Sequence, residues 1–78
     1  MTPSEIHDYQ RAITDDPAAT RRVLRYLDRH GIEHSGQITG GTLARLCRVH
    51  PRTWRKWAAG ERDIPETAVA LLRLVARV

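Results

Sequence analysis

Cysteine and aromatic residues are scarce in this chain of 78 residues. The single cysteine excludes an internal disulfide framework. Phenylalanine is absent and only two tyrosines and two tryptophans are present, so the core must consist mainly of Leu, Val, Ile and Ala. The sequence also lacks an apolar signal-peptide core and any run of apolar residues long enough to cross a membrane. We therefore expect a soluble, cytoplasmic protein.

The residue patterns typical of enzymes are also missing. The sequence has no Ser-His-Asp arrangement, no phosphate-cradling glycine motif and no carboxylate pair suited to a cleft. Cys47 and His50 lie close together in sequence, but one cysteine with scattered histidines does not make a tetrahedral zinc site. A chain of this length suits a single small domain with little room for a catalytic pocket. We expect no enzymatic activity, no metal and no cofactor.

Positive charge is concentrated in the middle of the chain. The formal net charge is +4, but residues 1–20 carry a net −3, and residues 21–56 carry nine Arg or Lys against two acids. Such a concentration suits a polyanionic partner, because neutralising phosphates releases counterions and favours binding. The alternative is that these arginines only cover solvated helix faces.

Each of the four prolines stands where a helix is expected to begin, since proline is favoured at the first helical position. Turn residues and apolar spacing then predict helices over about residues 3–13, 17–30, 39–48, 51–59 and 65–78. Side chains able to cap these helices are Thr2, Asp16, Thr39 and His50. No strand-like alternation is present, so the predicted fold is all-α: a compact bundle of about five short helices. Residues 1–15 are read as an N-terminal helix or arm, and residues 16–78 as the main domain.

The most informative segment is residues 43–60, which reads as two short helices joined by a sharp turn. Its apolar residues are spaced so that two crossed helices can share one small core; they are Ala44, Cys47, Val49, Trp54 and Trp57. Cys47 is expected to act as a small buried residue and the two tryptophans as core residues rather than base-stacking groups.

This segment carries a family resemblance. Leu43-Ala44, then Val49, then Thr53-Trp54-Arg55-Lys56-Trp57 and Gly60 resemble the Cro/repressor-like (XRE-type) helix-turn-helix regulators of phages and bacteria, and the similarity extends over about residues 23–75. In that family a glycine commonly makes the turn and a glutamine opens the first motif helix. Here these positions hold Arg48 and Gly40, so either Arg48 adopts a positive φ or the turn differs.

The resemblance implies sequence-specific binding of double-stranded DNA by a transcriptional regulator, a repressor by family analogy. It places the helix at residues 51–59 in the major groove, with Arg52, Arg55 and Lys56 as the base-reading residues. The free backbone N–H groups that follow Pro51 at the start of this helix are expected to lie near a phosphate. Further phosphate contacts are expected from Thr39, Thr42, Arg45, Arg48, Thr53 and Arg62.

The last predicted helix has a broader apolar arc than one small core needs, which favours a homodimer. The expected interface residues are Leu71, Leu74, Val75 and Val78, joined by Ile6, Tyr9 and Ile13 of the first helix. The alternative is that this helix is the central, doubly covered element of the bundle.

Two other functions stay open at this stage. The chain can be a small protein-interaction module or phage-type inhibitor that uses the same scaffold to bind a protein, and such a module should tolerate loss of Arg52 and Arg55. It can also bind nucleic acid without sequence preference.

Overall fold

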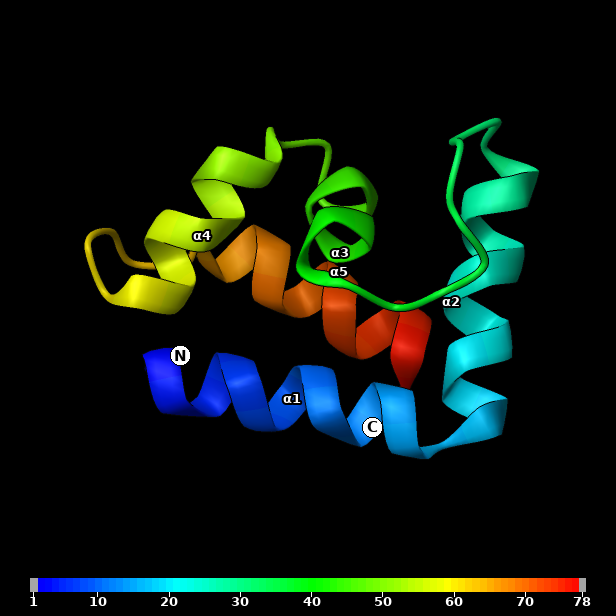
Figure 1. Cartoon of the computed structure of the whole chain (residues 1–78), viewed down its shortest axis with the longest axis horizontal. Coiled ribbons are helices and arrows are strands. Elements are labelled where there is room, and N and C mark those ends of the chain that lie inside the picture. The colour runs from blue at the N-terminus through cyan, green and yellow to red at the C-terminus, as the bar shows by residue number, and fades with distance from the viewer. Residues whose placement is uncertain (1, 78) are drawn as a thin grey trace.

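The computed structural model describes residues 2–77 and contains five helices within them, which confirms the predicted all-α fold (Figure 1). They are α1 (Pro3–Asp15), α2 (Pro17–Arg29), α3 (Gly40–Leu46), α4 (Pro51–Ala59) and α5 (Glu66–Ala76). No strand occurs among the described residues. Within that same range, no helix has both the length and the apolar character required to cross a membrane.

Helix starts agree closely with the sequence because they are set by local hydrogen bonds. The Thr2 hydroxyl accepts from the Glu5 N–H at 3.2 Å, and the Asp16 carboxylate accepts from the Ala18 N–H at 3.0 Å. Such side-chain acceptors satisfy backbone donors that the first helical turn leaves free. One start differs: Pro65 is the N-cap of α5 rather than its first residue, and no side chain caps this helix.

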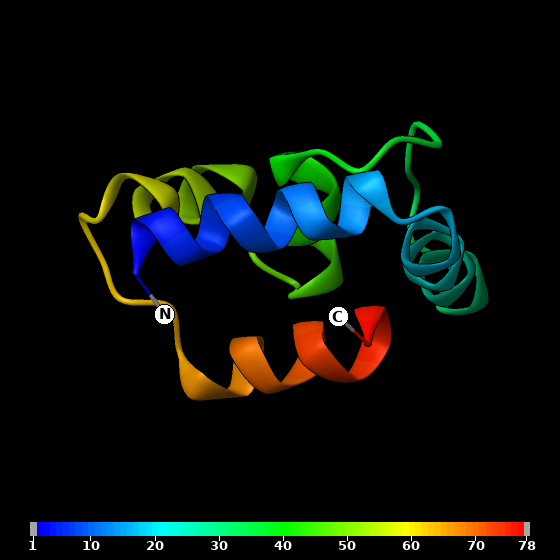
Figure 2. The ribbon, with the colours of Figure 1, turned by 90° about the horizontal axis from the view of Figure 1, so that it is seen from below.

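The helices surround one core rather than forming layers. In Figure 1, α4 and α2 lie at opposite ends of the molecule, with α3 and α5 between them and α1 along the bottom. The view from below shows the same separation of α4 from α2 (Figure 2). Helix α1 packs against both α2 and α4, α5 packs against α2, and α3 packs against α4. Helix α1 therefore bridges the two ends.

The core is aliphatic with two indoles, as the composition predicts. Its largest fully buried side chains are Ile6, Ile13, Val23, Leu27, Leu43, Leu46 and Leu72. Trp54 and Trp57 are 3% and 4% exposed, which confirms their predicted structural role. Their ring centroids lie 5.9 Å apart at an interplanar angle of 60°, a tilted aromatic contact.

Helix α1 belongs to this core. Ile6 and Ile13 are fully buried inside the chain, and Tyr9 is half-buried. The expectation that these residues join a dimer interface is therefore wrong for the two isoleucines, because their side chains already pack within the same chain. Val75 is also buried, so much of the broad apolar arc on α5 is used by the core.

Candidate nucleic-acid interface

The connection between α3 and α4 is a tight turn at residues 47–50, and its backbone resolves the alternatives left open for Arg48. Arg48 adopts the left-handed conformation, with φ 59°. Its N–H donates to the Arg45 carbonyl at 3.0 Å, and the Val49 N–H donates to the Ala44 carbonyl at 2.9 Å. This pair of hydrogen bonds defines a Schellman helix end, which satisfies carbonyls that the last turn of α3 would leave free.

The same hydrogen-bond pattern ends α2 at Gly31 and α4 at Gly60, where glycine takes the left-handed position. Arg48 therefore takes the same left-handed position at the end of α3 that Gly31 and Gly60 take after α2 and α4. A non-glycine residue in this conformation costs about 1 kcal/mol, which the packing of α3 against α4 must offset. The predicted helix to residue 48 is too long, since α3 ends at Leu46.

The second departure from the family pattern also has a packing reason. A Cβ atom built on Gly40 would lie 2.9 Å from the Cδ1 atom of Trp54 and 3.2 Å from its Nε1 atom. Real Cβ atoms essentially never approach another heavy atom below 3.0 Å, and an indole in a packed core has little room to move. The start of α3 thus lies directly against Trp54, and no larger residue, including glutamine, fits at position 40 with this indole in place.

Helix α4 separates an apolar inner face from a basic outer face. Its inner face carries Trp54 and Trp57, which are buried. On the opposite side of the helix, Arg52 and Arg55 lie about one turn apart and are exposed. Lys56 lies beside them and is half-buried. We call these three residues the α4 outer face. The fold thus brings the three predicted base-reading side chains together on one surface.

The predicted phosphate contacts are less uniform. Thr39, Arg45, Arg48 and Arg62 are exposed, and Thr53 is half-buried. Thr42 is only 4% exposed, and its hydroxyl donates to the Gln37 carbonyl at 2.7 Å, so its assignment to a phosphate is wrong. Its role is structural, because Thr39 and Thr42 form a reciprocal capping box at the start of α3. Residue spacing alone could not show that the hydroxyl turns inward.

The expected phosphate site at the start of α4 is also absent. His50 caps this helix, with its Nδ1 atom accepting from the Arg52 N–H at 3.0 Å. The Thr53 N–H donates to the His50 carbonyl at 2.8 Å, and Pro51 has no N–H. The first-turn donors that would face a phosphate are thus already paired, so any attraction of α4 for phosphate must come from its side chains.

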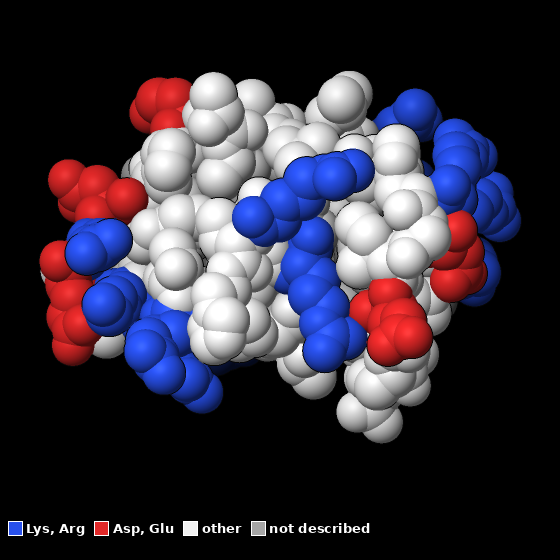
Figure 3. Space-filling view, turned by 90° about the horizontal axis from the view of Figure 1, so that it is seen from above, with Lys and Arg blue, Asp and Glu red and all other residues white. Residues whose placement is uncertain are grey.

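No Arg or Lys side chain of residues 2–77 forms an ion pair with a carboxylate. The one ion pair within 4.0 Å in this range joins His34 to Asp28 at 2.6 Å, and it involves no Arg or Lys. Arg45 is partly engaged, since its Nη1 atom donates to the Glu33 carbonyl at 2.9 Å. Figure 3 shows the basic side chains of the upper face in separate groups with acidic groups beside them. On this face the positive surface is therefore divided rather than continuous.

Titratable groups in the interior are poor candidates for chemistry. Cys47 is half-buried against the core, and burial raises the pKa of its thiol to about 11. A thiol with so high a pKa is a weak nucleophile at neutral pH. Among the described residues, no three His, Cys, Asp or Glu side chains gather as metal ligands.

The predicted dimer residues fall in different environments. Leu74 is 70% exposed and Leu71 is half-buried, whereas Val75 is 8% exposed and packs in the core. Val78 lies outside the described residues. A stable interface usually buries about 800 Å² on each partner. Leu71 and Leu74 alone supply only part of such an area.

Comparison with protein-family models, with curated proteins and with solved structures finds no match to this chain.

Proposed function

We propose that this chain is a helix-turn-helix protein that binds double-stranded DNA sequence-specifically through α4 and regulates transcription. The observation that carries the proposal is the division of α4 into two faces. Trp54 and Trp57 hold the helix against the body, and Arg52 and Arg55 extend from its other side without a carboxylate partner.

The turn supports the same proposal. A helix-turn-helix unit joins two short helices by a turn of three or four residues, and its second helix enters the major groove. Here α3 and α4 are joined through residues 47–50, and Arg48 takes the left-handed position where a glycine often stands. The turn fixes the direction of α4, and the indoles fix its rotation about its own axis.

Arginine on an exposed helix face can form two hydrogen bonds with the O6 and N7 atoms of guanine, which no other base offers in the same pattern. Arg52 and Arg55 lie three residues apart, so adjacent turns of α4 can present them to neighbouring base pairs. Lys56, at the side of this face, suits either guanine or a phosphate. Arg48 in the turn and Arg62 after α4 suit phosphates that fix the register without reading sequence.

Repression is the regulatory outcome we propose, by analogy with the family that residues 43–60 resemble. A helix in the promoter groove excludes other proteins from the same bases, and this needs no further part of the chain. A homodimer would place two copies of α4 on a palindromic site, with half-sites about 34 Å apart.

The test starts from duplexes selected out of a randomised pool and measures binding by fluorescence anisotropy across salt concentrations. The double variant Arg52→Ala/Arg55→Ala should weaken binding to the selected duplex at least about 10-fold, since each lost guanine contact costs about 1–3 kcal/mol. Binding to an unrelated duplex should weaken much less. The charge-matched control is Arg21→Ala/Arg25→Ala, which removes two arginines from the exposed side of α2.

Loss of selectivity in the α4 variant alone supports the proposal. Equal weakening by the two double variants would indicate a purely electrostatic attraction and contradict base reading. Failure of every duplex to bind would contradict the proposal and favour the protein-interaction module.

A further inference from the structure

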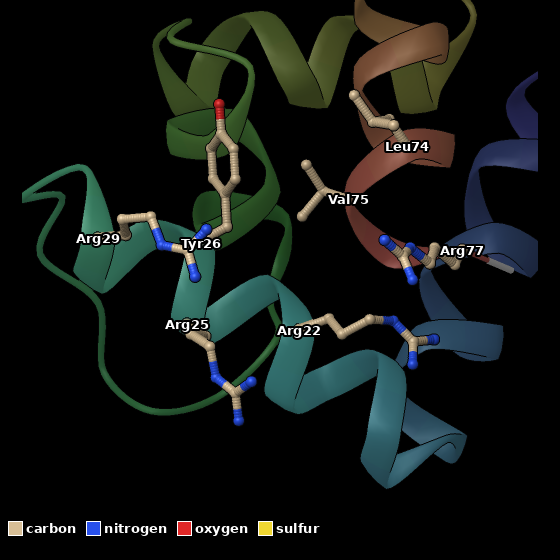
Figure 4. Close-up of a pocket in the computed structure, with 7 residues that line it drawn as sticks. All are labelled: Arg22, Arg25, Tyr26, Arg29, Leu74, Val75 and Arg77. Carbon is tan, nitrogen blue, oxygen red and sulfur yellow. The ribbon is translucent and has the colours of Figure 1, made fainter.

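A second basic surface lies at the end of the molecule away from α4. A cavity of about 420 Å³ opens between α2 and the end of α5 (Figure 4). Helix α2 contributes Arg22, Arg25 and Arg29 to its lining, and the end of α5 contributes Leu74 and Arg77. In Figure 4 the Arg77 side chain extends from α5 toward α2, so arginines approach the cavity from both helices. We call this site the α2–α5 pocket.

One of these arginines holds the pocket together. The Nε and Nη2 atoms of Arg22 donate to the Ala76 carbonyl at 3.1 and 2.7 Å. This carbonyl belongs to the last residue of α5, so no later N–H within the helix can donate to it. Arg22 thereby ties the end of α5 to the middle of α2, and its charge lies at the negative end of the α5 dipole.

The other three arginines are available. Arg25, Arg29 and Arg77 are exposed, and within residues 2–77 no carboxylate lies within 4.0 Å of their guanidinium groups. Arg77 adopts a left-handed backbone conformation, with φ 55°, at the C-cap of α5. Three unpaired guanidinium groups around one depression favour an anionic occupant, and guanidinium groups suit carboxylates because they can bind both oxygens.

The pocket also presents apolar surface. Leu74 is 70% exposed and is the one large hydrophobic residue that stands exposed among the described residues. It lines the pocket together with Val75 and the half-buried ring of Tyr26. These three side chains give the charged depression an apolar wall, against which an apolar side chain of a protein partner can pack.

We propose that the α2–α5 pocket docks an acidic segment of another protein, which places an apolar side chain against Leu74 and carboxylates beside Arg25, Arg29 and Arg77. A DNA backbone matches the charge but offers no apolar group for Leu74. A twofold contact with a second copy matches the leucine but sets the arginines of each copy against those of the other. An acidic segment with an apolar residue satisfies both features.

This inference goes beyond DNA binding and does not depend on it. Helix α2, which supplies much of the pocket lining, and helix α4 lie at opposite ends of the molecule (Figure 1), so we expect that both sites can be occupied at once. Occupancy of the pocket would bring an acidic protein to whatever α4 binds.

The probe is a fluorescein-labelled peptide of 12 residues that contains glutamates around two central leucines. Two companion peptides replace either the leucines by serine or the glutamates by glutamine. Binding to the full chain is followed by anisotropy, and the site is mapped from amide shifts in ¹⁵N-labelled protein. The shifts should concentrate in the second half of α2 and the last turn of α5.

The decisive variants are Arg25→Glu and Leu74→Ser, both at exposed positions, with Arg21→Glu as the matched control on the same helix but outside the pocket lining. We expect Arg25→Glu and Leu74→Ser each to weaken peptide binding by about 10-fold, as anchor positions in interfaces do. Arg21→Glu should weaken binding clearly less than Arg25→Glu does, because Arg21 does not line the pocket and its charge acts on the peptide only through salt-screened attraction. Both companion peptides should bind more weakly than the probe.

Several results would overturn the proposal. They are absence of shifts at millimolar peptide, equal weakening by Arg21→Glu and Arg25→Glu, and equal binding of the leucine-free peptide. Displacement of the peptide by a short DNA duplex would assign the pocket to nucleic acid instead. Self-association in sedimentation that Leu74→Ser abolishes would assign it to a second copy. The Arg52→Ala/Arg55→Ala variant should bind the peptide with the same affinity as the unmodified chain. Peptide binding therefore tests the pocket independently of DNA binding.

Discussion

The α4 outer face and the α2–α5 pocket carry similar charge but differ in what accompanies it. On α4 the large apolar side chains, Trp54 and Trp57, are turned inward and almost fully buried. At the pocket, Leu74 is exposed and lines the same depression as the arginines. Positive charge alone therefore does not identify a partner. The apolar surface beside it separates a site suited to phosphates and bases from one suited to a protein.

The two sites are also held differently. Helix α4 is capped by His50 at its start and ends at Gly60 in the left-handed conformation, and its indoles lock it against α3. The end of α5 depends on the hydrogen bonds from Arg22 to the Ala76 carbonyl. We therefore expect substitutions behind α4 to affect the whole fold and substitutions at the pocket to remain local.

The largest effect is expected from Trp54→Ala, set against Leu74→Ala. Removing the buried indole should lower the free energy of unfolding by about 3–5 kcal/mol, because it leaves a cavity in the core. Leu74→Ala should change it by less than about 0.5 kcal/mol, since the side chain is exposed. Urea unfolding followed by circular dichroism measures both. A cost above about 1 kcal/mol for Leu74→Ala would mean that this leucine is covered in solution, which breaks the comparison.

The next largest effect on stability is expected where α3 approaches α4 closely. Gly40 is the test position, and its neighbour Gly41 is the control. Gly40→Ala should destabilise the fold by about 1–3 kcal/mol, because the new Cβ overlaps the Trp54 ring. At Gly41 a Cβ would meet only the Thr39 hydroxyl oxygen, at an ordinary 3.6 Å. Gly41→Ala should therefore stabilise α3 by about 0.5–1 kcal/mol. Thermal unfolding measures both, and a neutral Gly40→Ala would show that the indole can shift.

These contacts also show which parts of the structure can be predicted from the sequence. Helix starts follow from short-range hydrogen bonds, so Thr2, Asp16, Thr39 and His50 are identified correctly as caps. The contact of Gly40 with Trp54 joins two helices, and no local pattern reveals it. The predicted phosphate contact of Thr42 is wrong for the same reason, since its hydroxyl donates to a carbonyl in the preceding loop.

The α4 outer face is predicted from the sequence of a single helix and the family resemblance of its segment, whereas the α2–α5 pocket is not predicted. Arg22, Arg25 and Arg29 are visible in sequence as one face of a helix. Their meaning depends on Leu74 and Arg77, about fifty residues away, which only the packing of α5 on α2 brings beside them. Similarly, the apolar arc of α5 does not show which of its leucines the core leaves exposed.

A smaller effect concerns the backbone of the turn. Arg48→Gly should stabilise the fold by about 1 kcal/mol relative to Arg48→Ala, because glycine adopts the positive φ of this position without strain. Both variants remove the same charge, so they should lower the salt dependence of duplex binding equally, by about 0.9 in the log–log slope if Arg48 contacts a phosphate. Unfolding in urea and anisotropy across salt measure the two effects. A peptide probe at the α2–α5 pocket should respond to neither variant. Equal stability of the two variants would contradict the strain assigned to Arg48.

The smallest expected effect on stability at neutral pH comes from a substitution at Tyr9, in the interior of the molecule. The Tyr9 hydroxyl is buried without a hydrogen-bond partner, and burial raises its pKa to about 12, with Arg73 opposing and Cys47 adding to the shift. The folded chain thus favours the protonated phenol, and the stability that this preference provides is lost as the pH rises from about 10 through 12. Tyr9→Phe removes the unpaired hydroxyl and should change stability at pH 7 by less than about 1 kcal/mol, toward a more stable fold.

The pH dependence separates Tyr9 from its neighbour. Burial raises the pKa of Cys47 from 9.0 to about 11, so its own contribution is lost over that lower range. Tyr9→Phe should flatten the fall in stability above pH 10, and Cys47→Ala should flatten the part that begins near pH 9. Urea midpoints from pH 8 to 12 distinguish them. An unchanged alkaline slope in Tyr9→Phe would mean that water reaches the phenol, and that the interior joining the α4 outer face to the α2–α5 pocket is wetter than its packing indicates.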